Sequence, residues 1–321
     1  MVSAGGAELP LTVGIDVGGT NIRAGVVDGA GIIIDTVEAA TPGSEQALEA
    51  ALARAVAELR GRHVITAVGL AVAGFVTPDN ATVLFAPHLP WLRAPVAHRM
   101  TERLELPVVL EHDANAAAWA ERRFGVAKDG RVVLLVAIGT GIGAGLLIDG
   151  TLFRGAHGVA PELGHLRVVP DGRACPCGKR GCWERYCSGT GLAATALELL
   201  AADPGAASVL TREVAASPGA LTGKRVMRAA RDGDRLATAA VTDLARWLGE
   251  GLAVVSDIYD PDLIVVGGGV GASATLFLDD ARAHYATRVT GSGHRPLARI
   301  RTAQMGATAG LVGAADLARA L

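Results

Sequence analysis

The densest group of reactive side chains lies between residues 162 and 184. It contains His165, Cys175, Cys177 and Cys182, which include three of the chain's 4 cysteines. Four nitrogen and sulfur donors this close in the chain predict a closed, tetrahedral Zn²⁺ site of the Cys₃His type. Such a site is structural, because protein ligands fill all four positions and none remains open for chemistry.

Two other interpretations of these cysteines stay open, namely disulfide bonds and plain buried thiols. Disulfides suit small secreted domains, and nothing else in the sequence looks secreted. The Cys-x-Cys spacing is also less typical of zinc sites than Cys-x-x-Cys. Gly178 and Gly181 favour the tight turns that would bring the ligands together. Glu162 and Glu184 flank the group, and Cys187 is expected to be a small buried residue outside it.

A glycine turn near the start of the chain has the composition of a phosphate-binding loop. An apolar run ends at Asp16, and Gly18, Gly19, Thr20 and Asn21 precede a second apolar run, so a strand, a turn and a strand are expected. Backbone N–H groups, the Thr20 hydroxyl and the Asn21 amide can cradle a phosphate, while Asp16 holds Mg²⁺ through water. An ordinary hairpin is the alternative, because short glycine motifs often match by chance.

The same pattern returns in the second half of the chain. Gly139, Thr140 and Gly141 lie between apolar runs at 132–138 and 144–148. Two matching turns can hold a nucleoside triphosphate from both sides. A dinucleotide-binding motif does not fit, because a strand and not a helix follows each turn. The Walker sequence of P-loop proteins is absent.

Two predicted strand-to-helix junctions could also contribute to a site. Gly267, Gly268 and Gly269 could bring the backbone close to an adenine or ribose, or form only a tight turn. Asp113 ends one predicted strand and opens a helix, where Asp is a favoured N-cap residue. It could equally be a general base that accepts the proton of a sugar hydroxyl during phosphoryl transfer. The two roles of Asp113 are compatible.

The repeated strand–turn–strand unit indicates a duplicated α/β fold. We expect a small α/β domain at 1–118 and a large α/β domain at 119–304 that carries the zinc loop. A helix at 305–321 is expected to pack back on the first domain. The other predicted helices are 44–60, 95–104, 115–124, 191–202, 223–232, 234–259 and 274–288.

Composition argues against several classes of protein. The chain has 30 basic and 32 acidic residues among 321, which disfavours nucleic acid or an anionic membrane as the main partner. Aromatic residues make up 4%, too few for a base-stacking surface.

Residues 1–10 lack a signal-peptide pattern and are expected to form a short flexible leader. Glycines interrupt the apolar run at 132–148, so two buried strands explain it better than a membrane span. We expect a soluble cytoplasmic protein.

The sequence resembles the ROK (repressor, open reading frame, kinase) family over nearly its whole length, and most of all the family's bacterial glucokinases. The resemblance rests on the segments 16–21, 111–116, 139–143 and 162–184. It implies the actin/hexokinase-like (ribonuclease H-like) ATPase fold, a duplicated two-domain fold with an interdomain cleft for ATP-Mg and a hexose. It also implies a homo-oligomer, a dimer or a tetramer.

The resemblance further implies a role for each candidate residue. The implied reaction is phosphorylation of glucose at O6, with Asp113 as the general base. The three side chains of Glu162, His165 and Glu184 would hold the remaining sugar hydroxyls. Structural zinc would be bound by His165, Cys175, Cys177 and Cys182.

Two positions depart from the family pattern. His112 stands directly before Asp113, and His88 lies in the segment 87–91, where similar glucokinases usually carry Asn. Both residues are expected to bind the sugar. Histidine could fill the same hydrogen-bonding role as asparagine, or it could change the sugar preference or weaken activity below pH ~6.5 as the imidazoles protonate.

Rival functions follow from the same resemblance. A kinase for mannose, fructose or an N-acetylated aminosugar is the enzymatic alternative, and a non-catalytic sugar-sensing regulator is the other. About ten residues precede the first predicted strand, too few for the helix-turn-helix of a repressor. The sequence leaves the choice between ATP and polyphosphate as donor undecided.

Overall fold

The computed structural model describes residues 10–217, 219 and 221–321, so the predicted leader lies outside the described residues except for Pro10. The chain divides into two compact units. The first comprises Met1–Asp129, Gly145–Pro161 and Ala307–Leu321, and the second Gly130–Ala144 and Glu162–Gly306. The contacts assign 119–129 and 145–161 to the first unit, whereas the boundaries expected from the sequence assign them to the second.

A five-stranded sheet with the order β3-β2-β1-β4-β8 forms the base of the first unit. Strands β1, β2 and β3 are antiparallel neighbours, while β4 and β8 run parallel to β1. The central strand β1 is buried along nearly its whole length, and the edge strand β3 alternates half-buried and exposed residues, as a strand with one solvated face does. The strands are β1 Leu11–Val17, β2 Asn21–Val27, β3 Ile33–Ala40, β4 Ile65–Val72 and β8 Val108–His112.

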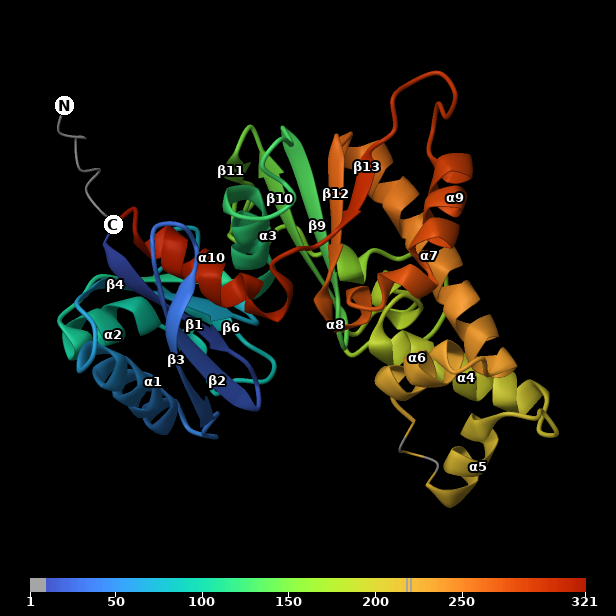
Figure 1. The fold of residues 1–321 in the computed structure, drawn as a ribbon, viewed down its shortest axis with the longest axis horizontal. Helices are drawn as coiled ribbons and strands as arrows, with labels where there is room; N and C mark the ends of the chain where they lie inside the picture. The colour runs from blue at the N-terminus through green and yellow to red at the C-terminus, as the bar shows by residue number, and fades with distance from the viewer. Residues whose placement is uncertain (1–9, 218, 220) are drawn as a thin grey trace, which may run out of the picture. The chain divides into compact units, whose positions relative to one another are not determined.

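Four helices accompany this sheet. They are α1 Glu45–Arg60, α2 Val96–Leu104, α3 Asp113–Arg123 and α10 Ala309–Ala318, and a 3-10 turn at Gly306–Thr308 precedes α10. Helix α10, red in Figure 1, packs on β1, β4 and α3. Small side chains permit this close packing, because Ala71, Ala116 and Ala314 form one buried cluster. Three short strands form a separate small sheet: β5 Phe75–Val76, β6 Val83–Phe85 and β7 Leu92–Ala94.

The second five-stranded sheet has the order β11-β10-β9-β12-β13, which repeats the order of the first sheet. Strands β9, β12 and β13 are parallel, and β10 and β11 are antiparallel. The expected duplication is therefore confirmed by the strand order. The strands are β9 Val132–Ile138, β10 Ile142–Ile148, β11 Thr151–Leu152, β12 Leu263–Gly267 and β13 Arg299–Thr302.

The helices between Gly189 and Arg288 all belong to the second unit. Helix α7 packs against α4, α6 and α9, and Figure 1 shows it as the long orange helix of this unit. The helices are α4 Gly189–Ala202, α5 Val209–Ala216, α6 Gly223–Arg231, α7 Arg235–Tyr259, α8 Gly268–Gly271 and α9 Leu278–Arg288. Three 3-10 turns lie at Leu163–His165, Trp183–Arg185 and Ala274–Leu276. Among the described residues, no helix is long and apolar enough to cross a membrane.

Several elements differ from the sequence-based expectations. The single helix expected at 274–288 is a 3-10 turn followed by α9, because the backbone of Phe277 between them departs from helical geometry, with φ −148° and ψ −15°. Helix α5 and the small sheet of β5, β6 and β7 were not expected. These elements are short, and short apolar stretches carry too little periodicity to be recognised.

Candidate functional site

The carboxyl ends of three parallel strands meet at one edge of the first sheet. In the register, Asp16 of β1 lies beside Ala71 of β4, which lies beside Glu111 of β8. Asp113 follows β8 directly and is the first residue of α3. The carboxyl edge of parallel strands is where α/β sheets place their ligand sites. The first unit therefore presents Asp16 and Asp113 at the edge where such a site belongs.

Asp113 does not cap its helix. The N-cap position belongs to His112, and no side chain makes a capping hydrogen bond there, so the N-cap interpretation of Asp113 is wrong. The Ala114 N–H donates to Asp113 Oδ1 at 2.7 Å, and His112 Nε2 lies 3.2 Å from the same oxygen. The Asp113 side chain is 43% exposed. A carboxylate that is solvent-accessible and held at one oxygen can accept a proton at the other.

A buried carboxylate next to Asp113 organises this end of the sheet. Glu111 Oε2 accepts hydrogen bonds from Arg154 Nε at 2.9 Å and Nη2 at 2.5 Å. Its Oε1 accepts from the His112 backbone N–H and from Asn115 Nδ2, both at 3.0 Å. Asn80 Nδ2 lies 3.3 Å from Oε2 and donates to the Leu110 carbonyl at 2.6 Å. A buried charge persists only when it is paired and hydrogen-bonded in this way.

The sequence reasoning assigned no role to this network. Arg154 is far from Glu111 in the chain, and only the folded chain pairs them. Asn115 lies in the first turn of α3, four residues after Glu111. The sequence could have indicated this contact, because an Asn in the first turn of a helix often forms local hydrogen bonds. The network fixes the backbone from which Asp113 projects.

Asp16 has an unusual charge environment. Its pKa is raised to about 6, chiefly by burial of the carboxyl group and then by the negative charge of Asp113, while Arg23 opposes the shift. Its carboxylate is therefore poorly solvated when ionised. A cation nearby would relieve that cost, which fits the predicted role of Asp16 in holding Mg²⁺.

The first glycine turn closes on itself. The Gly18 N–H donates to the Asn21 carbonyl at 3.0 Å, so Gly18 uses its own N–H inside the hairpin. Thr41 fixes the turn from outside through its N–H to the Thr20 carbonyl and its hydroxyl to the Gly18 carbonyl. In the described part of the chain, the N–H groups of Gly19 and Thr20 have no partner. The cradle predicted from the sequence thus has fewer available donors than expected.

His88 lies directly behind this turn. A β-carbon added to Gly19 would sit 2.8 Å from the His88 β-carbon. Only glycine fits at this approach. The structure therefore brings His88 to the glycine turn of the first unit, where Thr20 and Asn21 are exposed.

The second glycine turn is held by a helix. The Gly139 N–H closes the turn on the Gly141 carbonyl at 2.9 Å. The Gly139 carbonyl accepts from the Gly189 N–H at 2.8 Å, and the Thr140 carbonyl accepts from the Thr190 hydroxyl at 2.9 Å. Helix α4 begins at Gly189, so its positively polarised N-terminus lies at this turn.

Sequence reasoning missed Gly189 and Thr190, because it began the helix at 191. Ser188 was the available signal: its hydroxyl accepts from the Gly191 N–H, as an N-cap side chain does. The junction at Gly267–Gly269 is also nearby. A β-carbon on Gly268, which has φ +81°, would lie 2.5 Å from the Ile138 carbonyl at the end of β9.

The four predicted metal ligands come together in the second unit. The donor atoms of His165, Cys175, Cys177 and Cys182 all lie within 4.8 Å of one another. Cys175 Sγ is 3.7 Å from His165 Nδ1, and Cys177 Sγ is 3.6 Å from Cys182 Sγ. A tetrahedral zinc with bonds of about 2.0–2.3 Å requires neighbouring ligands roughly 3.5–3.8 Å apart. The donor set therefore fits zinc in both type and spacing.

The loop reaches this geometry by tight turns. Gly178 and Gly181 have φ +89° and +76°, and a β-carbon on Gly181 would overlap the Val169 carbonyl. Two isolated β-bridges, Arg167 with Cys182 and Ala174 with Arg180, close the loop on itself. Cys187 is fully buried and does not belong to the cluster.

Glu184 connects the cysteine cluster with the second glycine turn. Its Oε1 accepts from Cys175 Sγ at 3.2 Å and lies 3.6 Å from His165 Nδ1. A β-carbon added to Gly141 would overlap Glu184 Oε2. On the other side of the imidazole, His165 Nε2 is 3.9 Å from Glu162 Oε2. His165 thus turns one ring nitrogen to the thiols and the other to a carboxylate.

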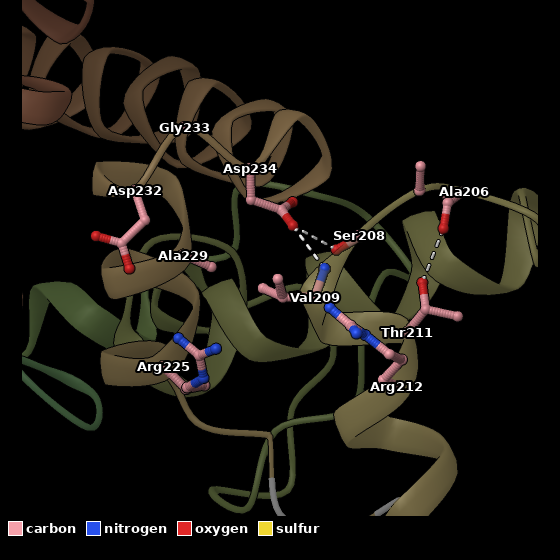
Figure 2. A pocket seen from close by; sticks show the side chains of 11 residues that line it. Ala206, Ser208, Val209, Thr211, Arg212, Arg225, Ala229, Asp232, Gly233 and Asp234 are labelled. Atoms are coloured by element: carbon pink, nitrogen blue, oxygen red, sulfur yellow. Dashed lines mark hydrogen bonds between the residues drawn. The ribbon is translucent and has the colours of Figure 1, made fainter.

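A pocket of about 620 Å³ lies elsewhere in the second unit, among α5, α6 and the start of α7 (Figure 2). Asp234 points to Ser208 and Val209, and its Oδ2 accepts from the Ser208 hydroxyl at 2.8 Å and the Val209 N–H at 2.9 Å. Arg225 on α6 is paired with Glu213 of α5. None of the residues predicted to do chemistry lines this pocket, and two of its polar residues, Ser208 and Asp234, cap helices α5 and α7.

Comparison with known proteins gives matches over nearly the whole chain. The sequence profile of the ROK family matches residues 12–321. A glucokinase of Streptomyces coelicolor is 45% identical over 309 residues, which cover 96% of this chain and 98% of that protein.

Solved structures agree with this match. The crystal structure of a ROK family glucokinase from Streptomyces griseus in complex with glucose and AMPPNP has a TM-score of 0.86 and 45% identity, covering 97% of this chain and 100% of that one. The crystal structure of a ROK hexokinase from Thermus thermophilus has a TM-score of 0.76 and 32% identity, covering 96% of this chain and 97% of that one. Together with the repeated strand order, these neighbours confirm the expected actin/hexokinase-like fold.

Proposed function

The chain belongs to the ROK family, and we propose that it is an ATP-dependent glucokinase that transfers the γ-phosphoryl group to O6 of glucose. The 45% identity to a glucokinase along nearly the whole chain supports this reaction. The observation that carries the proposal is the arrangement of Asp113, whose carboxylate is accessible to solvent and held at Oδ1 alone.

Asp113 is proposed to act as the general base. As glucose O6 attacks the γ-phosphorus, the O6–P bond forms and the bond from phosphorus to the β-phosphate oxygen breaks, so that ADP leaves. The O6 proton passes to Asp113 Oδ2. A base that orients the hydroxyl and accepts its proton is what phosphoryl transfer requires of the protein.

The two glycine turns are proposed to bind the phosphates of ATP. The N–H groups of Gly19 and Thr20 and the side chain of Asn21 are the donors that the first turn offers. Thr140 offers its N–H and hydroxyl in the second turn, beside the N-terminus of α4, where an anion is favoured. Bound Mg²⁺ would neutralise phosphate charge, and Asp16 would hold it through water.

His165, Cys175, Cys177 and Cys182 are proposed to bind one structural Zn²⁺. Their spacing fits a tetrahedral site with no open position, so the metal would act only to hold the loop. His165 Nδ1 faces the thiols, which leaves Nε2 available for a sugar hydroxyl. We propose that His165, Glu162 and Glu184 bind sugar hydroxyls and that His88 assists near the first turn.

The decisive experiment is a coupled assay of ADP release with ATP-Mg and glucose, on the wild type and Asp113→Asn. Loss of the base is expected to lower kcat by at least 10²-fold, the scale of general base catalysis. Asp279→Asn is the matched control, because Asp279 also lies in the first turn of a helix but its side chain is 93% exposed. Retained turnover in Asp113→Asn would overturn the assignment of the base.

A panel of hexoses tests the substrate. Glucose is expected to give the highest kcat/KM among glucose, mannose, fructose and N-acetylmannosamine. Faster turnover of another sugar would replace glucose in the proposal and leave the reaction type unchanged. Sugar binding without any turnover would instead indicate a sugar-sensing regulator.

A further inference from the structure

The contacts of Asp113 are one-sided. Both of its close contacts, with the Ala114 N–H and with His112 Nε2, are made by Oδ1. Within the described residues, Oδ2 makes no hydrogen bond or ion pair. The contact with His112 is attractive when Nε2 carries a proton, which holds for the imidazolium and for one neutral tautomer. The imidazole and the Ala114 N–H therefore both contact Oδ1.

His112 is itself held in place. Its backbone N–H donates to the buried Glu111, which Arg154 and Asn115 fix in turn. As the last residue of β8 it pairs in register with Val72 of β4. Its side chain is only 18% exposed, so the ring has little freedom to turn away from Asp113.

The negative charge of Asp16 near Asp113 gives a restraining partner of Asp113 a function. The charge of Asp113 contributes to the raised pKa of Asp16, so the two carboxylates lie in the same electrostatic neighbourhood. Two nearby carboxylates repel each other, and a half-exposed aspartate is free to rotate about its side-chain bonds. A ring nitrogen fixed at Oδ1 restrains that rotation.

We propose that His112 is a positioning residue that fixes Asp113 through Oδ1, so that Oδ2 faces the hydroxyl to be phosphorylated. This inference rests on the proposed function of Asp113 as the base. It differs from the expectation that His112 binds the sugar, because His112 Nε2 lies 3.2 Å from Asp113 Oδ1. Small errors in the position of a reacting group can cost as much as 10²-fold in rate.

The two roles have different kinetic signatures. Loss of a positioning partner lowers kcat and leaves KM for glucose nearly unchanged. Loss of a sugar contact that is equal in the ground and transition states raises KM and leaves kcat unchanged. The test is therefore the split between kcat and KM in His112 variants of the full chain.

We expect His112→Leu to lower kcat by about 10–100-fold, with KM for glucose within about threefold of the wild type. His112→Gln, which keeps an N–H donor, is expected to restore most of the rate. His63→Leu is the matched control: His63 Nε2 lies 2.9 Å from Asp35, a similar pair within the same unit but outside the site, so its kcat is expected to be unchanged.

Several outcomes would overturn the inference. An unchanged kcat in His112→Leu would do so, as would a raised KM with an intact kcat. Thermal unfolding would reveal whether His112→Leu folds. If it does not, His112→Gln is compared with His112→Glu. The Glu side chain has the same size as Gln, but it replaces the N–H donor with a negative charge like that of Asp113. Equal kcat values in those two variants would contradict the inference. If Asp113→Asn is active, the assignment of Asp113 as the base is wrong. If Asp113→Asn is inactive and His112→Leu has a normal kcat, only the inference about His112 is wrong.

Discussion

The two glycine turns share one sequence pattern but are supported differently. In each, the first glycine closes the turn with its own N–H, Gly18 on Asn21 and Gly139 on Gly141. The carbonyls of the first turn are held by Thr41, which follows an edge strand. Those of the second turn are held by the start of α4.

The source of negative charge also differs. Asp16 lies two residues before the first glycine of its turn, inside the strand. The corresponding residue of the second turn is Ala137, and the carboxylate there comes from Glu184, on a loop that the cysteine cluster holds. One turn therefore carries its own carboxylate, and the other takes its carboxylate from the loop of the cysteine cluster.

The largest expected effect in this comparison comes from Cys177→Ser. Removing one thiolate should abolish stoichiometric zinc, loosen the loop and release Glu184 from the second turn. We expect zinc content by metal analysis to fall to near zero, the melting temperature to drop, and KM for glucose to rise at least about tenfold. Cys187→Ala is the control, because Cys187 is buried outside the cluster and its variant should keep zinc. Full zinc occupancy in Cys177→Ser would disprove the ligand set.

A narrower change tests the contact between Glu184 and the second turn. In Gly141→Ala the new methyl group would overlap Glu184 Oε2, whereas in Gly139→Ala it would meet nothing within 4 Å. We expect kcat/KM for ATP and glucose to fall about tenfold in the first variant and less than about twofold in the second, since a misplaced group near the chemistry is costly. Zinc content should stay normal in both. Equal rates for the two variants would argue against a role for this contact.

A further prediction concerns stability and pH at the first turn. Folding raises the pKa of Asp16 from 3.8 to about 6, so the folded chain binds this proton more tightly than the unfolded chain does. The contribution of Asp16 is therefore most favourable below pH 4, and stability is lost as the pH rises toward 6. At 1.36 kcal/mol per pKa unit, Asp16→Asn should be about 2–3 kcal/mol more stable than the wild type at pH 7.5 and nearly equal at pH 3.5.

Denaturant unfolding at the two pH values would measure this difference, with activity expected to fall in the same variant. Asp35→Asn is a control for which the opposite change in stability is expected. Hydrogen bonds from Arg62 and His63 lower the pKa of Asp35 to about 2, so its stabilising contribution is present at neutral pH and lost in acid. Asp35→Asn should therefore be less stable than the wild type at pH 7.5. An Asp16→Asn variant destabilised at pH 7.5 would contradict the charge environment described for Asp16.

Local chemistry allowed much of this protein to be predicted from its sequence. The proposed zinc ligands could be chosen because four nitrogen and sulfur donors lie within one short loop, and their approach needs only local turns at Gly178 and Gly181. The duplicated fold was visible because the same strand–turn–strand pattern occurs twice. Asp113 could be singled out as a residue between a strand and a helix, but its supposed capping role was wrong because His112 takes the cap position.

Only the tertiary structure decided which groups support those residues. Three contacts join segments that the sequence gives no reason to pair: Arg154 with Glu111, Thr41 with Gly18, and Glu184 with Gly141. The same holds for Gly189, which reaches Gly139 from fifty residues along the chain. The sequence by itself determined which chemistry is available, because that depends on residue types at short spacing. The hydrogen-bonding partners of a carboxylate decide which of its oxygens stays open. Only the packing of distant strands and helices brings those partners within hydrogen-bonding distance.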